Sequence, residues 1–142
     1  MAVTCTSTLV QNLQVQRSKG VNTAFCLYDF KKTGITTSAS TYIQMVPLPH
    51  GARILDLWVR NDNLNTGAFT VGDGSLSTRF IASTSLAATL LTRMGNQLGA
   101  GYKVSLTVSD ENSFDTIDIS FGGATSDSAS GCIAMCVHYI ID

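Results

Sequence analysis

Charged residues are scarce in this sequence. Only 13% of its 142 residues are Asp, Glu, Lys or Arg, against about 25% in an ordinary soluble domain. The nine basic and ten acidic residues nearly cancel, and the longest basic run is the pair Lys31-Lys32. Because a nucleic-acid-binding protein normally carries a basic patch, we predict no nucleic-acid partner. A surface with so few charges is weakly protected against association. This favours a protein whose surface is covered by further copies of the chain or by a partner. The alternative is a monomer with a hydroxyl-rich surface.

Long apolar runs and a leader segment are also missing. No uninterrupted apolar run reaches the ~18 residues that a membrane helix needs, so we predict no membrane span. Residues 1–13 lack a basic segment followed by an apolar core, so we expect no signal peptide and synthesis in the host cytoplasm. The four cysteines, Cys5, Cys26, Cys132 and Cys136, could pair in three ways, but without a secretory signal we expect thiols.

Nucleophile and metal-ligand patterns are weak. The histidines are His50, in a proline-containing loop, and His138, in a predicted strand, and no Gly-x-Ser-x-Gly elbow is present. Cys132, Cys136 and His138 could suggest a metal site. Four residues of strand, however, span roughly 13 Å, too far for two ligands of one zinc ion. We therefore expect these to be core residues rather than ligands.

Two acidic patterns have simpler structural explanations. Asp115 and Asp118 fall on opposite faces of a predicted strand, so alternation keeps their carboxylates apart. The step Gly72-Asp73-Gly74 lacks the Lys-Ser/Thr of a phosphate-binding loop and the repeated carboxylates of a calcium loop, and it predicts a tight turn. The sequence therefore predicts a protein that is not an enzyme, with no catalytic residues, no metal and no cofactor.

Strand signals dominate the chain instead. Short runs of β-branched and aromatic residues, separated by Gly, Pro, Asn and Asp, are typical of strands and turns. About eight runs qualify, at residues 24–30, 41–46, 53–60, 68–71, 79–82, 102–108, 115–121 and 132–141. Pro47 and Pro49 should end the second run because proline removes ladder donors. The last run is apolar on both faces, which predicts a central strand covered on both sides.

Residues 83–96 are ambiguous. A short helix is favoured by four apolar residues at helical spacing, with a possible cap at Ser85 and a stop at Gly95. Those four residues are Leu86, Leu90, Leu91 and Met94. A strand through residues 88–93 is the alternative.

The strand count and the near absence of helix predict an all-β fold. About eight short strands with frequent turns favour an antiparallel β-sandwich, jelly-roll-like, over other classes. We expect a single sandwich domain over residues 21–142. Residues 1–20 are polar and irregular, and we expect an N-terminal arm or edge segment there.

The strand at residues 53–60 carries the only tryptophan. Simple alternation gives it a core face of Leu55, Leu57 and Val59, and a second face of Ile54, Asp56, Trp58 and Arg60. Trp and Arg are over-represented among interface hot spots, so the second face predicts a protein interface anchored by Trp58. The alternative is that the faces are reversed and Trp58 belongs to the core.

Several short elements together resemble one family. They are LNTG, VGDG and TRFI within residues 61–81, then GYKVSL, DTIDISF, a Gly/Ser-rich loop and a closing CVHYIID. Over residues 50–142 the chain resembles capsid decoration, or cement, proteins of tailed bacteriophages. The resemblance implies a β-sandwich that forms homo-oligomers, with trimers favoured. It also implies a virion protein on the capsid exterior whose partner is the major capsid protein, and which clamps neighbouring capsid subunits.

Two other functions remain open. A phage tail or fibre module that binds a receptor should carry exposed aromatic residues in its loops, and here the loops are rich in Ser, Thr, Gly and Asn. A carbohydrate-binding β-sandwich usually presents two or three aromatic residues on one exposed face, and in the sequence only Trp58 clearly qualifies.

Overall fold

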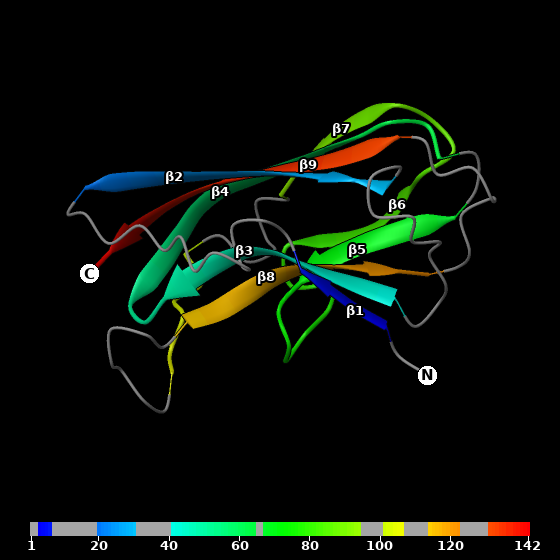
Figure 1. The fold of residues 1–142 in the computed structure, drawn as a ribbon. Helices are drawn as coiled ribbons and strands as arrows, with labels where there is room; N and C mark the ends of the chain where they lie inside the picture. The colour runs from blue at the N-terminus through cyan, green and yellow to red at the C-terminus, as the bar shows by residue number, and fades with distance from the viewer. Residues whose placement is uncertain are drawn as a thin grey trace.

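The computed structural model describes seven stretches of the chain, which together form nine strands in two sheets (Figure 1). The stretches are residues 3–6 (backbone only), 20–30, 41–64, 67–94, 101–106, 114–122 and 131–142. Within them, no helix is long and apolar enough to cross a membrane.

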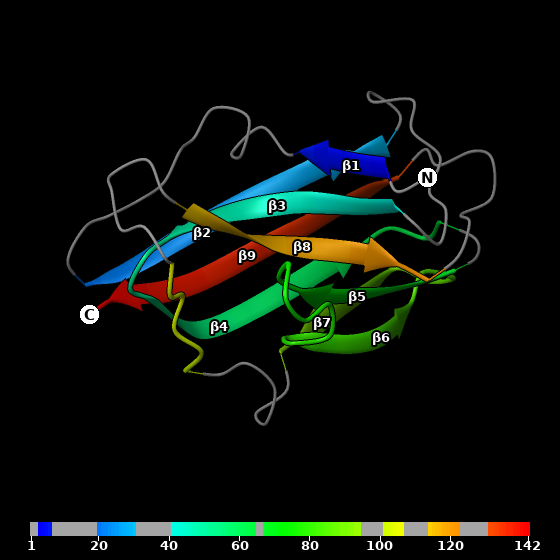
Figure 2. The same ribbon diagram turned by 90° about the horizontal axis from the view of Figure 1, so that it is seen from below.

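The two sheets lie face to face (Figures 1 and 2). The five-stranded sheet has the order β1 (Val3–Thr6), β3 (Thr41–Pro49), β8 (Phe114–Phe121), β5 (Ala68–Gly72) and β6 (Ile81–Ser85). The four-stranded sheet has the order β2 (Val21–Asp29), β9 (Cys132–Ile141), β4 (Ala52–Asn61) and β7 (Leu90–Arg93). Neighbouring strands are antiparallel, except that β1 runs parallel to β3. The predicted all-β antiparallel sandwich is confirmed.

Alternation along the strands builds the core. In β2, Ala24, Cys26 and Tyr28 point into the sandwich, whereas Phe25 and Leu27 are exposed on its outside. This pattern is typical of antiparallel sheets that are covered on one face only. The largest fully buried side chains include Tyr139, Phe30, Phe69, Phe80, Met45 and Leu57. They come from both sheets and from the turns between them, so one core holds the sandwich together.

The segment that was ambiguous contains a strand. β7 pairs with the end of β4, from Trp58 to Asn61. Leu90 and Leu91 are exposed while Leu86 is buried, so these leucines share no helical face. The preferred helix is wrong in the described part of the segment and the strand alternative is confirmed, because an open edge of β4 offers ladder partners.

The proline residues do not end β3. The strand continues through Pro47 and Pro49 beyond its predicted end at Val46. β1 accompanies β3 only as far as Gln44, whereas β8 accompanies it to Pro49. Past Gln44 the described strand therefore has one ladder partner, and an edge position tolerates the missing proline N–H.

The predicted strand at residues 102–108 is much reduced in its described part. This segment forms one isolated bridge, between Lys103 and Arg53 at the start of β4. Two flanking backbone bonds, Ile54 N to Tyr102 O at 2.9 Å and Val104 N to Ala52 O at 2.8 Å, hold it there. The segment therefore holds the start of β4 in place.

Part of the predicted N-terminal arm is an edge strand. Val3–Thr6 pair in register with Thr41–Gln44, which places β1 at the edge of the five-stranded sheet (Figure 2). Residues 7–19 lie outside the described part of the chain, so the rest of the arm stays a prediction.

Candidate functional site

A β-bulge in β4 decides which of its side chains face outward. The pairing with β9 passes from Ile54 directly to Asp56, which leaves Leu55 as an extra residue. Alternation restarts after a bulge, so Ile54 is fully buried while Leu55 is exposed. The placement of Ile54 on the interface face and of Leu55 on the core face was therefore wrong, because a sequence pattern cannot reveal an inserted residue.

The other three predicted interface residues, Asp56, Trp58 and Arg60, do share one face. It is the outer face of the four-stranded sheet, and register aligns its side chains in rows across the strands. One row is Phe25, Cys136, Trp58 and Arg93, and the next is Leu27, Ala134, Arg60 and Leu91. In each row the residue of β9 is small and the residues beside it are large. The predicted central position of β9 is confirmed, but its second face belongs to this outer surface.

Apolar side chains on this outer face are strongly exposed. Phe25 and Leu27 each expose 53% of their surface and Leu91 exposes 64%. The ring centroids of Phe25 and Trp58 are 6.2 Å apart with an interplanar angle of 54°, an ordinary geometry for an aromatic pair. A contiguous exposed apolar patch is a feature of interaction sites, so this outer face is the candidate functional site.

Charged groups border the aromatic pair. Arg93 forms an ion pair with Asp56 across the β4–β7 pairing. Arg60 is exposed and forms no ion pair with any residue that the structure describes. A guanidinium without an internal partner can bind a carboxylate of another molecule in a two-bond geometry.

Cys136 and His138 lie beneath these side chains on β9. The Cys136 Sγ is 3.5 Å from the His138 Nε2. Burial raises the pKa of the Cys136 thiol, and the nearby charge of Asp56 raises it further. The thiol is therefore held protonated, the opposite of what a nucleophilic cysteine requires. As predicted, Cys132 and Cys136 are thiols rather than disulfide-bonded.

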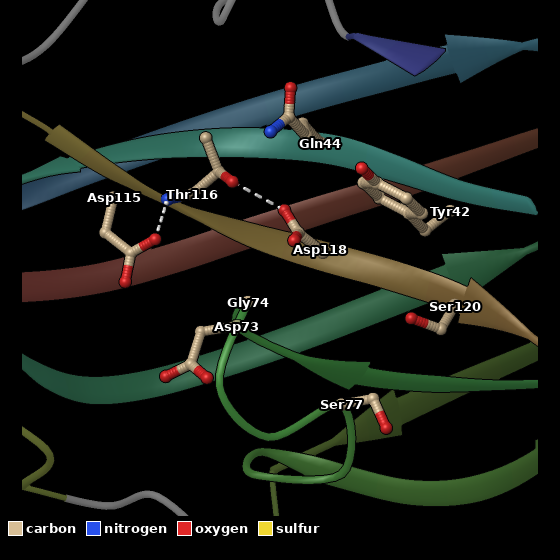
Figure 3. Close-up of a pocket in the computed structure, with 9 residues that line it drawn as sticks. All are labelled: Tyr42, Gln44, Asp73, Gly74, Ser77, Asp115, Thr116, Asp118 and Ser120. Atoms are coloured by element: carbon tan, nitrogen blue, oxygen red, sulfur yellow. Dashed lines mark hydrogen bonds between the residues drawn. The ribbon is translucent and has the colours of Figure 1, made fainter. Parts of the chain in front are cut away.

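A second feature lies on the other sheet. A pocket of about 410 Å³ is lined by Tyr42, Gln44, Asp73, Gly74, Ser77, Asp115, Thr116, Asp118 and Ser120 (Figure 3). Strand alternation separated Asp115 from Asp118 in the sequence, yet both line this pocket. What brings Asp73 to them is the pairing of Gly72 with Asp118 between β5 and β8, which no local pattern could predict. Within the described residues, no cluster of three His, Cys, Asp or Glu is arranged to hold a metal ion.

Three solved phage capsids contain chains of similar fold. A chain in the capsid asymmetric unit of cyanophage Pam1 matches with a TM-score of 0.70 at 19% identity, over 89% of this chain and 91% of that chain. A chain in the capsid of Ralstonia phage GP4 matches with a TM-score of 0.70 at 16% identity, over 99% of both chains. A chain in the acidic stable capsid of Helicobacter pylori bacteriophage KHP30 matches with a TM-score of 0.58 at 14% identity, over 89% of this chain and 90% of that chain.

Comparison by sequence found no match. No family model matches the chain, and no curated protein matches it. At the low identities above, the structural likeness establishes a shared fold. This chain is thus a two-sheet β-sandwich of the same architecture as small chains found in phage capsids.

Proposed function

We propose that this chain is a non-enzymatic structural protein of a bacteriophage virion, which binds the outer surface of the capsid and stabilises it by clamping neighbouring capsid subunits. Three phage capsids contain a chain of this fold, and each match covers at least 89% of this chain and 90% of the other. The likeness therefore extends over whole chains of comparable length. The resemblance of residues 50–142 to capsid decoration proteins leads to the same proposal.

The observation that carries the proposal is the exposed aromatic and aliphatic patch on the four-stranded sheet. Phe25, Leu27 and Leu91 expose about half or more of their surface there. Covering such side chains with a partner gains about 25 cal/mol for each Å² of apolar surface removed from water. Trp58 and Arg60 supply the residue types that most often dominate binding energy. This outer face is accordingly the surface that contacts the capsid or a neighbouring copy.

Repetition explains how a small domain can stabilise a shell. We infer that the partners are the major capsid protein and further copies of this chain, with a trimer favoured. A symmetric oligomer presents the same patch several times, and simultaneous weak contacts add as avidity. Such a protein requires a rigid scaffold and few charges where subunits meet, and the chain has only 13% charged residues.

One observation favours a second function. Phe25 lies beside Trp58 on an exposed face, so two aromatic residues are available for stacking on a sugar ring, more than the sequence indicated. A carbohydrate-binding module, on its own or in a phage tail or fibre, would use this pair as its platform. A glycan array separates the two functions: saturable binding to a defined glycan that is lost in Phe25→Ala supports this alternative and contradicts capsid binding as the role of the patch.

The decisive experiment measures binding to shells. Virus heads prepared without this chain are mixed with the purified protein and pelleted, and the bound fraction is measured against protein concentration. We expect saturable binding by the wild type and at least about a tenfold loss of affinity in Trp58→Ala and Arg60→Glu, since a hot-spot truncation costs about 2 kcal/mol or more.

Leu76→Ala is the matched control. Leu76 exposes 48% of its surface, comparable to Phe25, but lies in the turn after β5, away from the four-stranded sheet. It should bind like the wild type. Absence of any binding to the heads contradicts the capsid proposal. Equal binding by all variants contradicts the assignment of the outer face. A monomer in light scattering at micromolar concentration contradicts the homo-oligomer.

A further inference from the structure

The pocket on the five-stranded sheet is closed on one side by a tight turn, residues 73–80, which we call the Asp73 turn. The Asp73 carboxylate accepts hydrogen bonds from Ser75 N at 3.0 Å and Leu76 N at 2.8 Å. It also forms an ion pair with Arg79, whose Nε lies 2.6 Å from Asp73 Oδ2. The Arg79 guanidinium in turn lies 4.1 Å from the centroid of the Tyr102 ring. Asp73 therefore organises the turn and occupies its one basic side chain.

The turn folds back over the end of β5, the strand that pairs with β8. Gly72, directly before it, pairs with Asp118. A Cβ atom on Gly72 would lie 2.0 Å from the Leu76 carbonyl oxygen, which shows how tightly the turn folds back over this last residue of β5. Asp118, opposite, exposes only 8% of its surface. Figure 3 shows its carboxylate in the pocket between Thr116 and the Asp73 turn.

Asp118 is surrounded by acidic and neutral groups. The Thr116 hydroxyl donates to its Oδ1 at 2.6 Å. Acidic groups face it from two elements, Asp115 on its own strand and Asp73 in the turn, while β3 contributes the neutral groups Tyr42 and Gln44. Of the described residues that line the pocket, none is basic. Arg79, the cation that the described residues place beside the pocket, is already bound to Asp73.

The protonation of Asp118 follows from this setting. Burial raises the pKa of Asp118 to about 7, with the charges of Asp115 and Asp73 adding to the rise and the Thr116 hydrogen bond opposing it. Burial likewise raises the pKa of Asp115. For Asp73 burial also opposes ionisation, but hydrogen bonds from Leu76, Arg79 and Ser75 outweigh it and lower the pKa. Asp73 is therefore the permanent anion, and Asp118 changes charge near neutral pH.

We propose that Asp118 and the Asp73 turn form a proton-operated latch, in which neutral Asp118 lets the turn close over β8 and ionised Asp118 repels Asp73 and loosens it. A buried ionised carboxylate without a cationic partner is costly, and none of the described residues that line this pocket is basic. Repulsion between Asp118 and Asp73 displaces the turn, because the turn is short and its backbone hydrogen bonds are chiefly internal. The latch is independent of the capsid proposal, since it rests on the opposite sheet.

The direction of the pH effect is fixed by linkage. A carboxyl whose pKa is higher in the folded than in the unfolded chain stabilises the fold when it is protonated. That stability is complete below the ordinary pKa of 3.8 and is lost as the pH rises through about 7. The latch therefore closes in acid and opens in mild alkali, the reverse of the behaviour of a salt-bridged aspartate.

The test compares thermal unfolding of the whole chain at pH 5 and pH 8. We expect the wild-type midpoint to fall by about 5 °C or more between these values, since about 1 kcal/mol moves the midpoint of a domain this size by several degrees. Asp118→Asn keeps the acceptor for Thr116 and cannot ionise, so it should lose at least half of that fall. Asp56→Asn, on the opposite sheet, should retain the wild-type fall.

A direct titration guards against a variant that fails to fold. The ¹³C signal of the Asp118 carboxyl in the wild type should titrate well above pH 5, and Asp115→Asn should shift that midpoint downward by removing a like charge. A midpoint below pH 5, or an unchanged pH dependence of unfolding in Asp118→Asn, overturns the latch.

Discussion

The rings of Phe25 and Trp58 meet above Cys136, a residue of the strand that separates them. Their centroids are 6.2 Å apart, although β2 and β4 are two strand spacings apart, roughly 9.5 Å. The contact is possible because Cys136, in register with both, is too small to keep the rings apart. A small residue in the central strand thus creates the aromatic centre of the exposed patch.

This pair should be energetically coupled. Aromatic pairs contribute about 0.5–1.5 kcal/mol beyond the area that they bury. In a double-mutant cycle of Phe25→Ala and Trp58→Ala, measured by urea unfolding, we expect a coupling free energy in that range. The control cycle replaces Phe25 and Leu91, which lie on the two edge strands, and should be additive within about 0.5 kcal/mol. Additivity in both cycles would contradict the ring contact.

The bulge in β4 predicts opposite outcomes at adjacent residues. Ile54 is fully buried and Leu55 is 43% exposed. Ile54→Ala should therefore destabilise the fold by about 2–5 kcal/mol, as large-to-small core substitutions do, while Leu55→Ala should cost about 0.5 kcal/mol or less. Chemical unfolding of both variants is the measurement. Unbroken alternation through residues 53–60 predicts the reverse order, so the larger cost at Leu55 would refute the bulge.

The same strand shows where a sequence pattern stops being informative. Alternation identified the outward-facing Asp56, Trp58 and Arg60 correctly, because these residues follow the bulge, and failed at Ile54, which precedes it. The last strand was predicted at the bounds observed, Cys132–Ile141, because an apolar run with β-branched and aromatic residues that follows a polar loop is typical of a strand. The β-sandwich class was predicted from the number of such runs along the chain, without knowing which strands pair.

Features that depend on pairing between distant segments could not be predicted. Leu90 belongs to a strand only because the edge of β4 offers it a partner, and its spacing from neighbouring leucines favoured a helix. Phe25 was absent from the predicted interface because nothing local places it beside Trp58. The acidic pocket was missed for the same reason, since Asp73 and Asp118 are brought together by the β5–β8 pairing.

Arg79 should set the ionisation of Asp73. Its ion pair helps to lower the pKa of that carboxyl against the opposing effect of burial. A lowered pKa stabilises the fold above the ordinary value of 3.8, and this stability is lost as the pH falls through the folded-state pKa. In Arg79→Gln the ¹³C titration midpoint of Asp73 should therefore rise, and acid unfolding should begin at a higher pH. Arg93→Gln, on the other sheet, should leave the Asp73 midpoint unchanged, and an unshifted midpoint in Arg79→Gln would contradict the pairing.

Two glycines on either side of Asp73 offer a matched test of how tightly the turn is folded. A Cβ on Gly72 would lie 2.0 Å from the Leu76 carbonyl oxygen and 2.5 Å from the Ser77 carbonyl carbon, whereas a Cβ on Gly74 would meet nothing within 4 Å. Backbone cannot yield as a flexible side chain can, so Gly72→Ala must displace the turn from its position over the end of β5. We expect it to destabilise the fold by about 2 kcal/mol or more, in the range of strained or overpacked substitutions. Gly74→Ala should change stability by about 0.5 kcal/mol or less.

If the turn closes the acidic pocket, Gly72→Ala should also expose Asp118 to water. The titration midpoint of Asp118 should then fall, because burial is the main cause of its raised pKa. Equal stability of the two variants would show that the turn is not folded tightly over Gly72.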